Sequence, residues 1–111
     1  MDNNSVNNVN IEKAVELIKT NKDLKLLDIR GPYEVKATGF IEGSMLLDPN
    51  DRQIIETIEN LDRDKEYLLY CASGGRSSAV SQYMLKKGFK HLNNLINAGY
   101  IELSIALENS K

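Results

Sequence analysis

The residue with the greatest chemical potential in this sequence is Cys71, the only cysteine of the chain. It opens the segment Cys-Ala-Ser-Gly-Gly-Arg-Ser-Ser over residues 71–78, between an apolar run and an amphipathic stretch. Glycines let the backbone turn with several N–H groups facing inward, and a following helix adds the positive end of its dipole. Arg76 contributes a permanent charge nearby. Because these effects favour a thiolate, and would equally hold a persulfide anion or an oxyanion, we predict that Cys71 is a nucleophile.

A second interpretation of Cys71 has to be weighed against this one. A cysteine at the end of an apolar strand is usually a small buried hydrophobe, and two glycines after a strand are usually only a turn. The combination of strand, small-residue loop and helix, with an arginine five residues after the thiol, favours the functional interpretation. The two interpretations differ in whether backbone amides face the sulfur.

Short apolar runs of strand length alternate along the chain with stretches of helical periodicity. The expected strands cover residues 24–29, 45–47, 67–71 and 89–95. The expected helices cover residues 10–19, 33–37, 54–61, 76–87 and 101–107. This alternation is typical of an α/β domain with a mainly parallel sheet. Ligands of such sheets bind beyond the carboxyl ends of the strands, where Cys71 is expected to lie.

The composition excludes several classes of protein. A chain of 111 residues with 41% hydrophobic and 27% charged residues fits one soluble globular domain. The 14 Lys and Arg against 16 Asp and Glu give a net charge of -2, which offers no electrostatic reason to expect a nucleic acid or an anionic membrane as partner. One cysteine and one histidine, His91, are too few for an intrachain disulfide, a cysteine-based zinc site or most transition-metal sites.

The ends of the chain are polar. We expect residues 1–8 to be a disordered tail, residues 9–107 to form the domain and residues 108–111 to be a short C-terminal tail. The start has neither the basic nor the apolar stretch of a secretory signal. The longest apolar run, residues 67–72, is far shorter than the roughly 20 residues that span a bilayer. We therefore expect a cytoplasmic protein.

The segment after Cys71 resembles the active-site loop of the rhodanese family of sulfurtransferases. Single-domain members of this family carry a Cys-x-x-Gly-x-Arg loop between a central strand and a helix, and Cys71, Gly74 and Arg76 match it. Three other segments resemble family motifs in the same order: Asp-x-Arg-x-Pro-x-Glu at 28–34, Gly-x-Ile-x-Gly at 39–43 and Gly-Phe with a later Leu at 88–95. The resemblance covers about residues 9–107.

The resemblance implies a rhodanese-like α/β fold, with a central, mainly parallel five-stranded sheet and helices on both faces. It also implies a ping-pong reaction without metal or organic cofactor. In that reaction the Cys71 thiolate takes a sulfane sulfur from a thiosulfate-like or persulfide donor and passes it to a thiol or cyanide-type acceptor. The acceptor would be a small molecule or a partner protein. The persulfide would be held by the loop residues Ala72, Ser73, Gly74, Gly75 and Arg76, and Arg76 would orient the donor or leaving group.

Several positions depart from the family pattern. Ala72 stands where the family often has a basic residue, which should weaken the attraction for a small dianion such as thiosulfate. Phe40 replaces a common histidine, Ala98-Gly99 replaces a Gly-Gly pair, and the usual tryptophan is missing. These departures retain the nucleophile and leave the donor open.

Asp28, Arg30 and Ser77 are expected to support the loop. Asp28 and Arg30 flank the end of a strand next to it, where they either shape the pocket or, as we favour, form an ion pair that maintains the fold. His91 is expected at the surface or at a strand edge. The basic residues Lys86, Lys87 and Lys90 are expected to form a solvated helix end rather than a docking patch.

Three other functions remain open. Cysteine phosphatases and arsenate reductases also use a thiolate in an anion-binding loop, but such phosphatases generally place five residues between cysteine and arginine and a histidine before the cysteine. Here four residues intervene and Tyr70 precedes Cys71, so the loop encloses a smaller anion site. Rhodanese-like domains can also act as non-catalytic interaction modules, although these often lack the cysteine. The third alternative is a persulfide carrier that serves a partner protein and turns over small donors poorly. Ala72, in place of a basic residue, favours this alternative.

Overall fold

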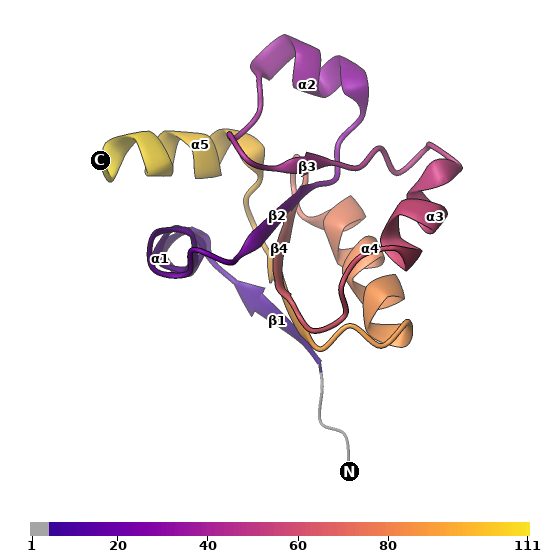
Figure 1. Ribbon diagram of the computed structural model, residues 1–111. Coiled ribbons are helices and arrows are strands. Elements are labelled where there is room, and N and C mark those ends of the chain that lie inside the picture. The colour runs from indigo at the N-terminus through magenta and orange to yellow at the C-terminus, as the bar shows by residue number, and fades with distance from the viewer. Residues whose placement is uncertain (1–4) are drawn as a thin grey trace.

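A five-stranded, all-parallel sheet forms the centre of the domain (Figure 1). The computed structural model describes residues 5–111. The strands are β1 (Val6–Val9), β2 (Lys25–Asp28), β3 (Met45–Leu46), β4 (Glu66–Tyr70) and β5 (His91–Leu95), in the order β1-β5-β4-β2-β3. The helices are α1 (Ile11–Thr20), α2 (Pro32–Thr38), α3 (Gln53–Glu59), α4 (Gly75–Lys86) and α5 (Tyr100–Asn109).

Helices cover both faces of the sheet, which is why the central strand β4 is continuously apolar. On one face, Leu69 packs in a cluster with Ile58 of α3 and Met84 of α4. On the other face, Leu68 packs with Ala14 of α1 and Leu103 of α5. Figure 1 shows the two pairs of helices on opposite sides of the strands. The predicted α/β fold with a mainly parallel five-stranded sheet between helices is confirmed.

The helices occur close to where the apolar periodicity predicts them, with ends that differ by a few residues. The side chain of Asn10 accepts a hydrogen bond from the backbone N–H of Lys13 at 2.9 Å, so it caps α1. Gly88 follows α4 with a φ of 92°, the left-handed conformation that commonly ends a helix. Within residues 5–111, no helix combines the length and the apolar character that crossing a membrane requires.

The predicted ends of the domain need correction. Residues 6–8, which we expected in a disordered tail, belong to β1, which pairs with β5 in parallel from Val6–Leu92 to Val9–Leu95. Two asparagines conceal this strand in the sequence, because asparagine is depleted in strands. Its place in the sheet depends on main-chain pairing with β5. At the other end, α5 extends to Asn109. Residues 1–4 of the predicted tail lie outside the described residues.

The parallel arrangement brings the carboxyl ends of the strands to one edge of the sheet, and Cys71 lies there. Asp28 at the end of β2 pairs in register with Tyr70 at the end of β4, and Cys71 is the next residue. The start of α5 also reaches this edge, because the N–H of Tyr100 donates a hydrogen bond to the carbonyl of Cys71 at 2.8 Å. A side chain on Gly99 would overlap the main chain of Ala72. Glycine is therefore needed at position 99.

Candidate active site

The loop between β4 and α4 directs backbone amides at the sulfur of Cys71. The N–H of Gly74 donates to Sγ at 3.1 Å and the N–H of Ser77 donates at 3.5 Å. Gly74 has a φ of 105°, a left-handed conformation that side chains rarely adopt, and its Cβ would lie 3.4 Å from the carbonyl oxygen of Leu95. Glycine at this position therefore lets the loop turn its amides toward the thiol.

The pKa of the Cys71 thiol is set by two opposing influences. Burial raises it, because a buried thiolate loses its hydration. Hydrogen bonds from the Ser77 hydroxyl, and then from the backbone N–H groups of Ser77, Ser73 and Gly74, lower it and outweigh the burial. The pKa therefore lies below its ordinary value, as expected for a nucleophilic cysteine. The Ser77 hydroxyl has a second acceptor within reach, the carbonyl oxygen of Gly74 at 3.3 Å.

Cys71 is also completely covered. Its exposed fraction is 0%, and its side chain belongs to the apolar cluster beneath α3 and α4 that includes Leu69 and Met84. The two sequence interpretations thus describe the same atom, because the sulfur is buried like a hydrophobe and faced by amides like a nucleophile. A donor can reach Sγ only after a movement of the groups that cover it.

Arg76 is held by a carboxylate that the sequence analysis did not select as a site residue. Its Nη1 and Nη2 donate to Oε1 and Oε2 of Glu34 on α2, at 2.5 and 2.8 Å. The hydrogen bond to Arg76 is the main cause that lowers the pKa of Glu34 to about 2. The pKa of Arg76 is raised, first by its bond to Glu34 and to a smaller extent by the nearby charge of Cys71. The sequence pointed to Glu34 only as the last residue of the Asp-x-Arg-x-Pro-x-Glu segment at 28–34.

Comparison with known proteins shows the family to which the chain belongs. The model of the rhodanese-like domain family matches residues 10–104. This chain belongs to the rhodanese-like domain family. The Bacillus subtilis protein YtwF, which carries the name sulfurtransferase, is 41% identical over 78 residues that cover 70% of this chain and 73% of that protein. A sulfurtransferase of Allochromatium vinosum is 29% identical over 90 residues, covering 81% of each chain.

A solved structure shows the same fold. The crystal structure of a rhodanese-related protein from Thermoplasma volcanium is similar with a TM-score of 0.69 and 28% identity. The similarity covers 89% of this chain and 90% of that one.

In this rhodanese-like domain, the buried pair Asp28–Arg30 braces the edge of the sheet next to the loop. Nε and Nη2 of Arg30 each donate to the Asp28 carboxylate at 2.8 Å. The remaining donors bind the Thr38 hydroxyl and the carbonyl of Gly39, and the guanidinium lies 3.9 Å from the centre of the Tyr100 ring. Each nitrogen of the Arg30 guanidinium thus donates at least one hydrogen bond. The structure therefore contains the expected ion pair, and its role in maintaining the fold stays a prediction.

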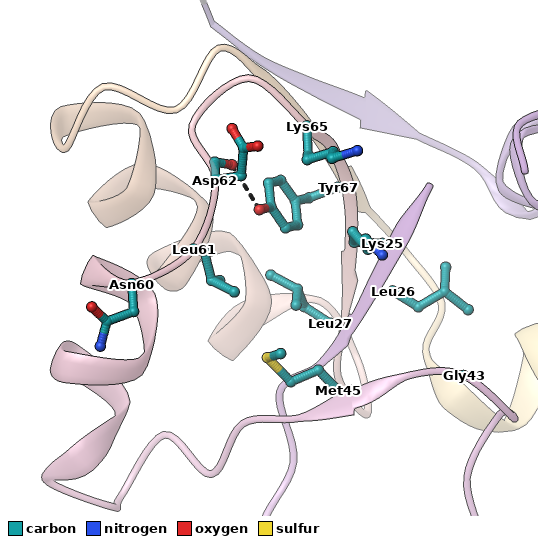
Figure 2. A pocket seen from close by; sticks show the side chains of 10 residues that line it. All are labelled: Lys25, Leu26, Leu27, Gly43, Met45, Asn60, Leu61, Asp62, Lys65 and Tyr67. Carbon is teal, nitrogen blue, oxygen red and sulfur yellow. Dashed lines mark hydrogen bonds between the residues drawn. The ribbon is translucent and has the colours of Figure 1, made fainter. Parts of the chain in front are cut away.

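Two cavities differ in their relation to the loop. An apolar groove of about 280 Å³ between α3 and α4 reaches the loop at Arg76. Its wall includes Ile54, Ile55, Val80 and Tyr83. A second cavity of about 310 Å³ lies at the opposite end of the sheet, beside the starts of β2 and β4 (Figure 2).

The remaining polar residues that the sequence singled out lie away from the loop. His91 is exposed at the start of β5. Lys87 lies 3.7 Å from a carboxylate oxygen of Glu59, and Lys90 lies 3.2 Å from one of Asp64. These contacts leave the basic cluster partly neutralised, as expected for a solvated helix end.

Proposed function

We propose that this rhodanese-like domain is a sulfurtransferase that carries a sulfane sulfur as a persulfide on Cys71. The observation that carries the proposal is the pair of amides, of Gly74 and Ser77, that face a thiol whose pKa is lowered. The names of the relatives from Bacillus subtilis and Allochromatium vinosum support sulfur transfer as the reaction class.

The reaction has two steps that balance without an external oxidant or reductant. In the first, the Cys71 thiolate attacks the sulfane sulfur of the donor, a new S–S bond forms, and the donor's own S–S bond breaks so that its leaving group departs with the electron pair. In the second, an acceptor thiolate attacks the terminal sulfur and Cys71 leaves as a thiolate. The donor is a thiosulfate-like anion or a persulfide, and the acceptor is a small thiol, a cyanide-type nucleophile or a partner protein's thiol.

The loop stabilises negative charge in both states. In the resting state the amides of Gly74 and Ser77 hold the thiolate, and after transfer the charge moves one atom outward to the terminal sulfur. The remaining loop positions, Ala72, Ser73, Gly75 and Arg76, surround that atom in the proposed intermediate. Amides that are already oriented toward the charge need little reorganisation as it moves.

The burial of Cys71 and the engagement of Arg76 favour a related second function, that of a persulfide carrier. A sulfur with an exposed fraction of 0% is protected between encounters. A partner that displaces the covering groups would then exchange sulfur faster than a small donor. The cysteine phosphatase alternative is disfavoured, because Glu34 occupies the arginine that would have to bind a phosphoryl group.

Mass spectrometry of the intact protein after incubation with a sulfane donor tests the proposal. We expect a gain of one sulfur atom that is removed by a thiol acceptor and is absent in Cys71→Ser. A carrier would load once and turn over slowly, whereas an enzyme would release product continuously. An unmodified Cys71 after exposure to several donors, or phosphate release from an aryl phosphate instead of sulfur transfer, would contradict the proposal.

A further inference from the structure

We infer that Glu34 selects sulfur donors by their charge. It binds Arg76, the only cationic side chain of the Cys71 loop, and so disfavours donors that carry two negative charges. This inference rests on the proposed sulfur transfer and deepens it by specifying the donor. Thiosulfate, a dianion, should therefore be a poorer donor than an equally sized monoanion or a persulfide.

The loop has only one positive side chain to offer. Arg76 is the only charged residue between positions 71 and 78, and Ala72 adds no cation beside the thiol. Both carboxylate oxygens of Glu34 bind the Arg76 guanidinium, so the two charges cancel within one bidentate pair. A second anion must displace Glu34 before it can use this cation.

Glu34 is fixed by a second contact that does not involve Arg76. Its Oε1 accepts a hydrogen bond from the backbone N–H of Gly31 at 3.1 Å, at the start of α2. The carboxylate therefore belongs to the helix start as well as to the ion pair. Its pKa of about 2 keeps it charged throughout the physiological range.

The charged residues around the loop do not supply a free cation in place of Arg76. The cavity beside α2 is lined by Asp48 and Asp51 together with Lys36, so carboxylates offset its lysine. Its other cation, Arg30, is bound to Asp28. On the side of α5, Glu102 accepts a hydrogen bond from the N–H of Gly99 at 2.7 Å and adds another carboxylate. These surroundings oppose a donor that carries two negative charges.

Two donors of nearly the same shape separate charge from size. Thiosulfate carries two negative charges, and methanethiosulfonate carries one, with a methyl group in place of one oxygen. In each case the Cys71 thiolate forms an S–S bond to the sulfane sulfur, the bond from that sulfur to the sulfonyl sulfur breaks, and sulfite or methanesulfinate leaves with the electron pair. The ratio of the two rates of persulfide formation measures the preference for charge.

The decisive variant is Glu34→Gln, whose amide oxygen can still accept from Gly31 while its charge is gone. We expect the ratio of thiosulfate to methanethiosulfonate efficiency to rise about threefold to fivefold at low ionic strength. The change should appear in KM for thiosulfate rather than in kcat, and added salt should diminish it. In the double variant Glu34→Gln/Arg76→Gln the rise in the ratio of thiosulfate to methanethiosulfonate efficiency should disappear, because that variant has no Arg76 guanidinium to release.

Glu102→Gln is the matched control. Glu102 also caps the start of a helix by accepting from a glycine N–H, but within residues 5–111 it forms no salt bridge. Its substitution should leave the donor ratio unchanged. The inference is overturned if Glu34→Gln leaves the ratio unchanged, if Glu102→Gln raises it equally, or if the double variant keeps the gain. An unmodified Cys71 in the wild-type protein after exposure to both of these donors and to a persulfide donor would instead contradict the proposed function, so the two failures are distinguishable.

Discussion

The two ends of the sheet differ in what they offer to a ligand. At the amino ends of the strands, the 310 Å³ cavity of Figure 2 has a mixed lining. Apolar side chains such as Leu27, Met45 and Leu61 lie there together with the polar residues Lys25, Asn60, Asp62 and Lys65. A polar group within it is already satisfied, since the hydroxyl of Tyr67 donates to the carbonyl of Asp62 at 2.7 Å. At the carboxyl ends, the candidate site has backbone amides aimed at a thiol.

This contrast follows from the direction of the chain. Parallel strands with helical connections bring helix starts, with their free N–H groups, to the carboxyl edge of the sheet. The start of α4 supplies the amide of Ser77 to Cys71 in this way. Reactivity at this edge therefore depends on the backbone amides that the loop and the helix start direct at the thiol.

The largest expected effect is on stability, at the Asp28–Arg30 ion pair beside the carboxyl ends of the strands. Arg30→Met should lower the free energy of unfolding by about 3–5 kcal/mol, because it leaves the buried Asp28 carboxylate without its partner. Lys25→Met, at the exposed amino end of the same strand, should change it by less than about 0.5 kcal/mol. Urea denaturation measures both. Equal effects would show that the two ends are not stabilised differently.

Next in size is the effect of moving an amide away from the thiol. Gly74→Ala should slow persulfide formation by about tenfold or more, because alanine disfavours the left-handed backbone that points the N–H at Sγ. Gly43→Ala is the matched control, since Gly43 also has a positive φ, of 87°, but lines the cavity at the other end. It should destabilise the fold without slowing transfer in the folded protein. A similar loss in both variants would attribute the effect to general destabilisation.

A smaller effect is expected on the pKa of the Cys71 thiol. Ser77→Ala removes the hydroxyl, which makes the largest of the contributions that lower the pKa of Cys71. The pKa should therefore rise toward its ordinary value, and the pH midpoint of alkylation by iodoacetamide should move upward. Ser81→Ala, one turn later on α4, removes a buried hydroxyl that donates to the carbonyl of Ser77 instead. In Ser81→Ala the pH midpoint of alkylation should stay at the wild-type value. A shift equal to that of Ser77→Ala would argue against a direct role of the Ser77 hydroxyl.

The smallest expected effect concerns the cavity at the amino ends of the strands. Met45→Ala widens it at a partly exposed position and should change the rate of sulfur transfer by less than about twofold. Single-turnover persulfide formation measures this. A much greater loss would mean that the amino end takes part in the reaction and would remove the contrast between the two ends.

Sequence patterns predicted the elements whose signals are local. The run of apolar residues in β4 and the periodicity of α4 identify these elements without knowledge of their neighbours. The strand β1 was missed because its stability lies in pairing with β5, which is remote in sequence. The side chains of Asn7 and Asn93 meet at 3.4 Å across a separation of 86 residues.

The sequence by itself determined the chemistry of the loop. The thiol, the glycine that turns the chain and the amides that follow all lie within residues 71–77, where neighbouring residues govern backbone conformation. Only the tertiary structure decided that Cys71 is covered and that Arg76 is bound by Glu34, 42 residues away. Both results come from the packing of elements that are distant in sequence. Burial and long-range ion pairs exist only after those elements have assembled, so no local pattern encodes them.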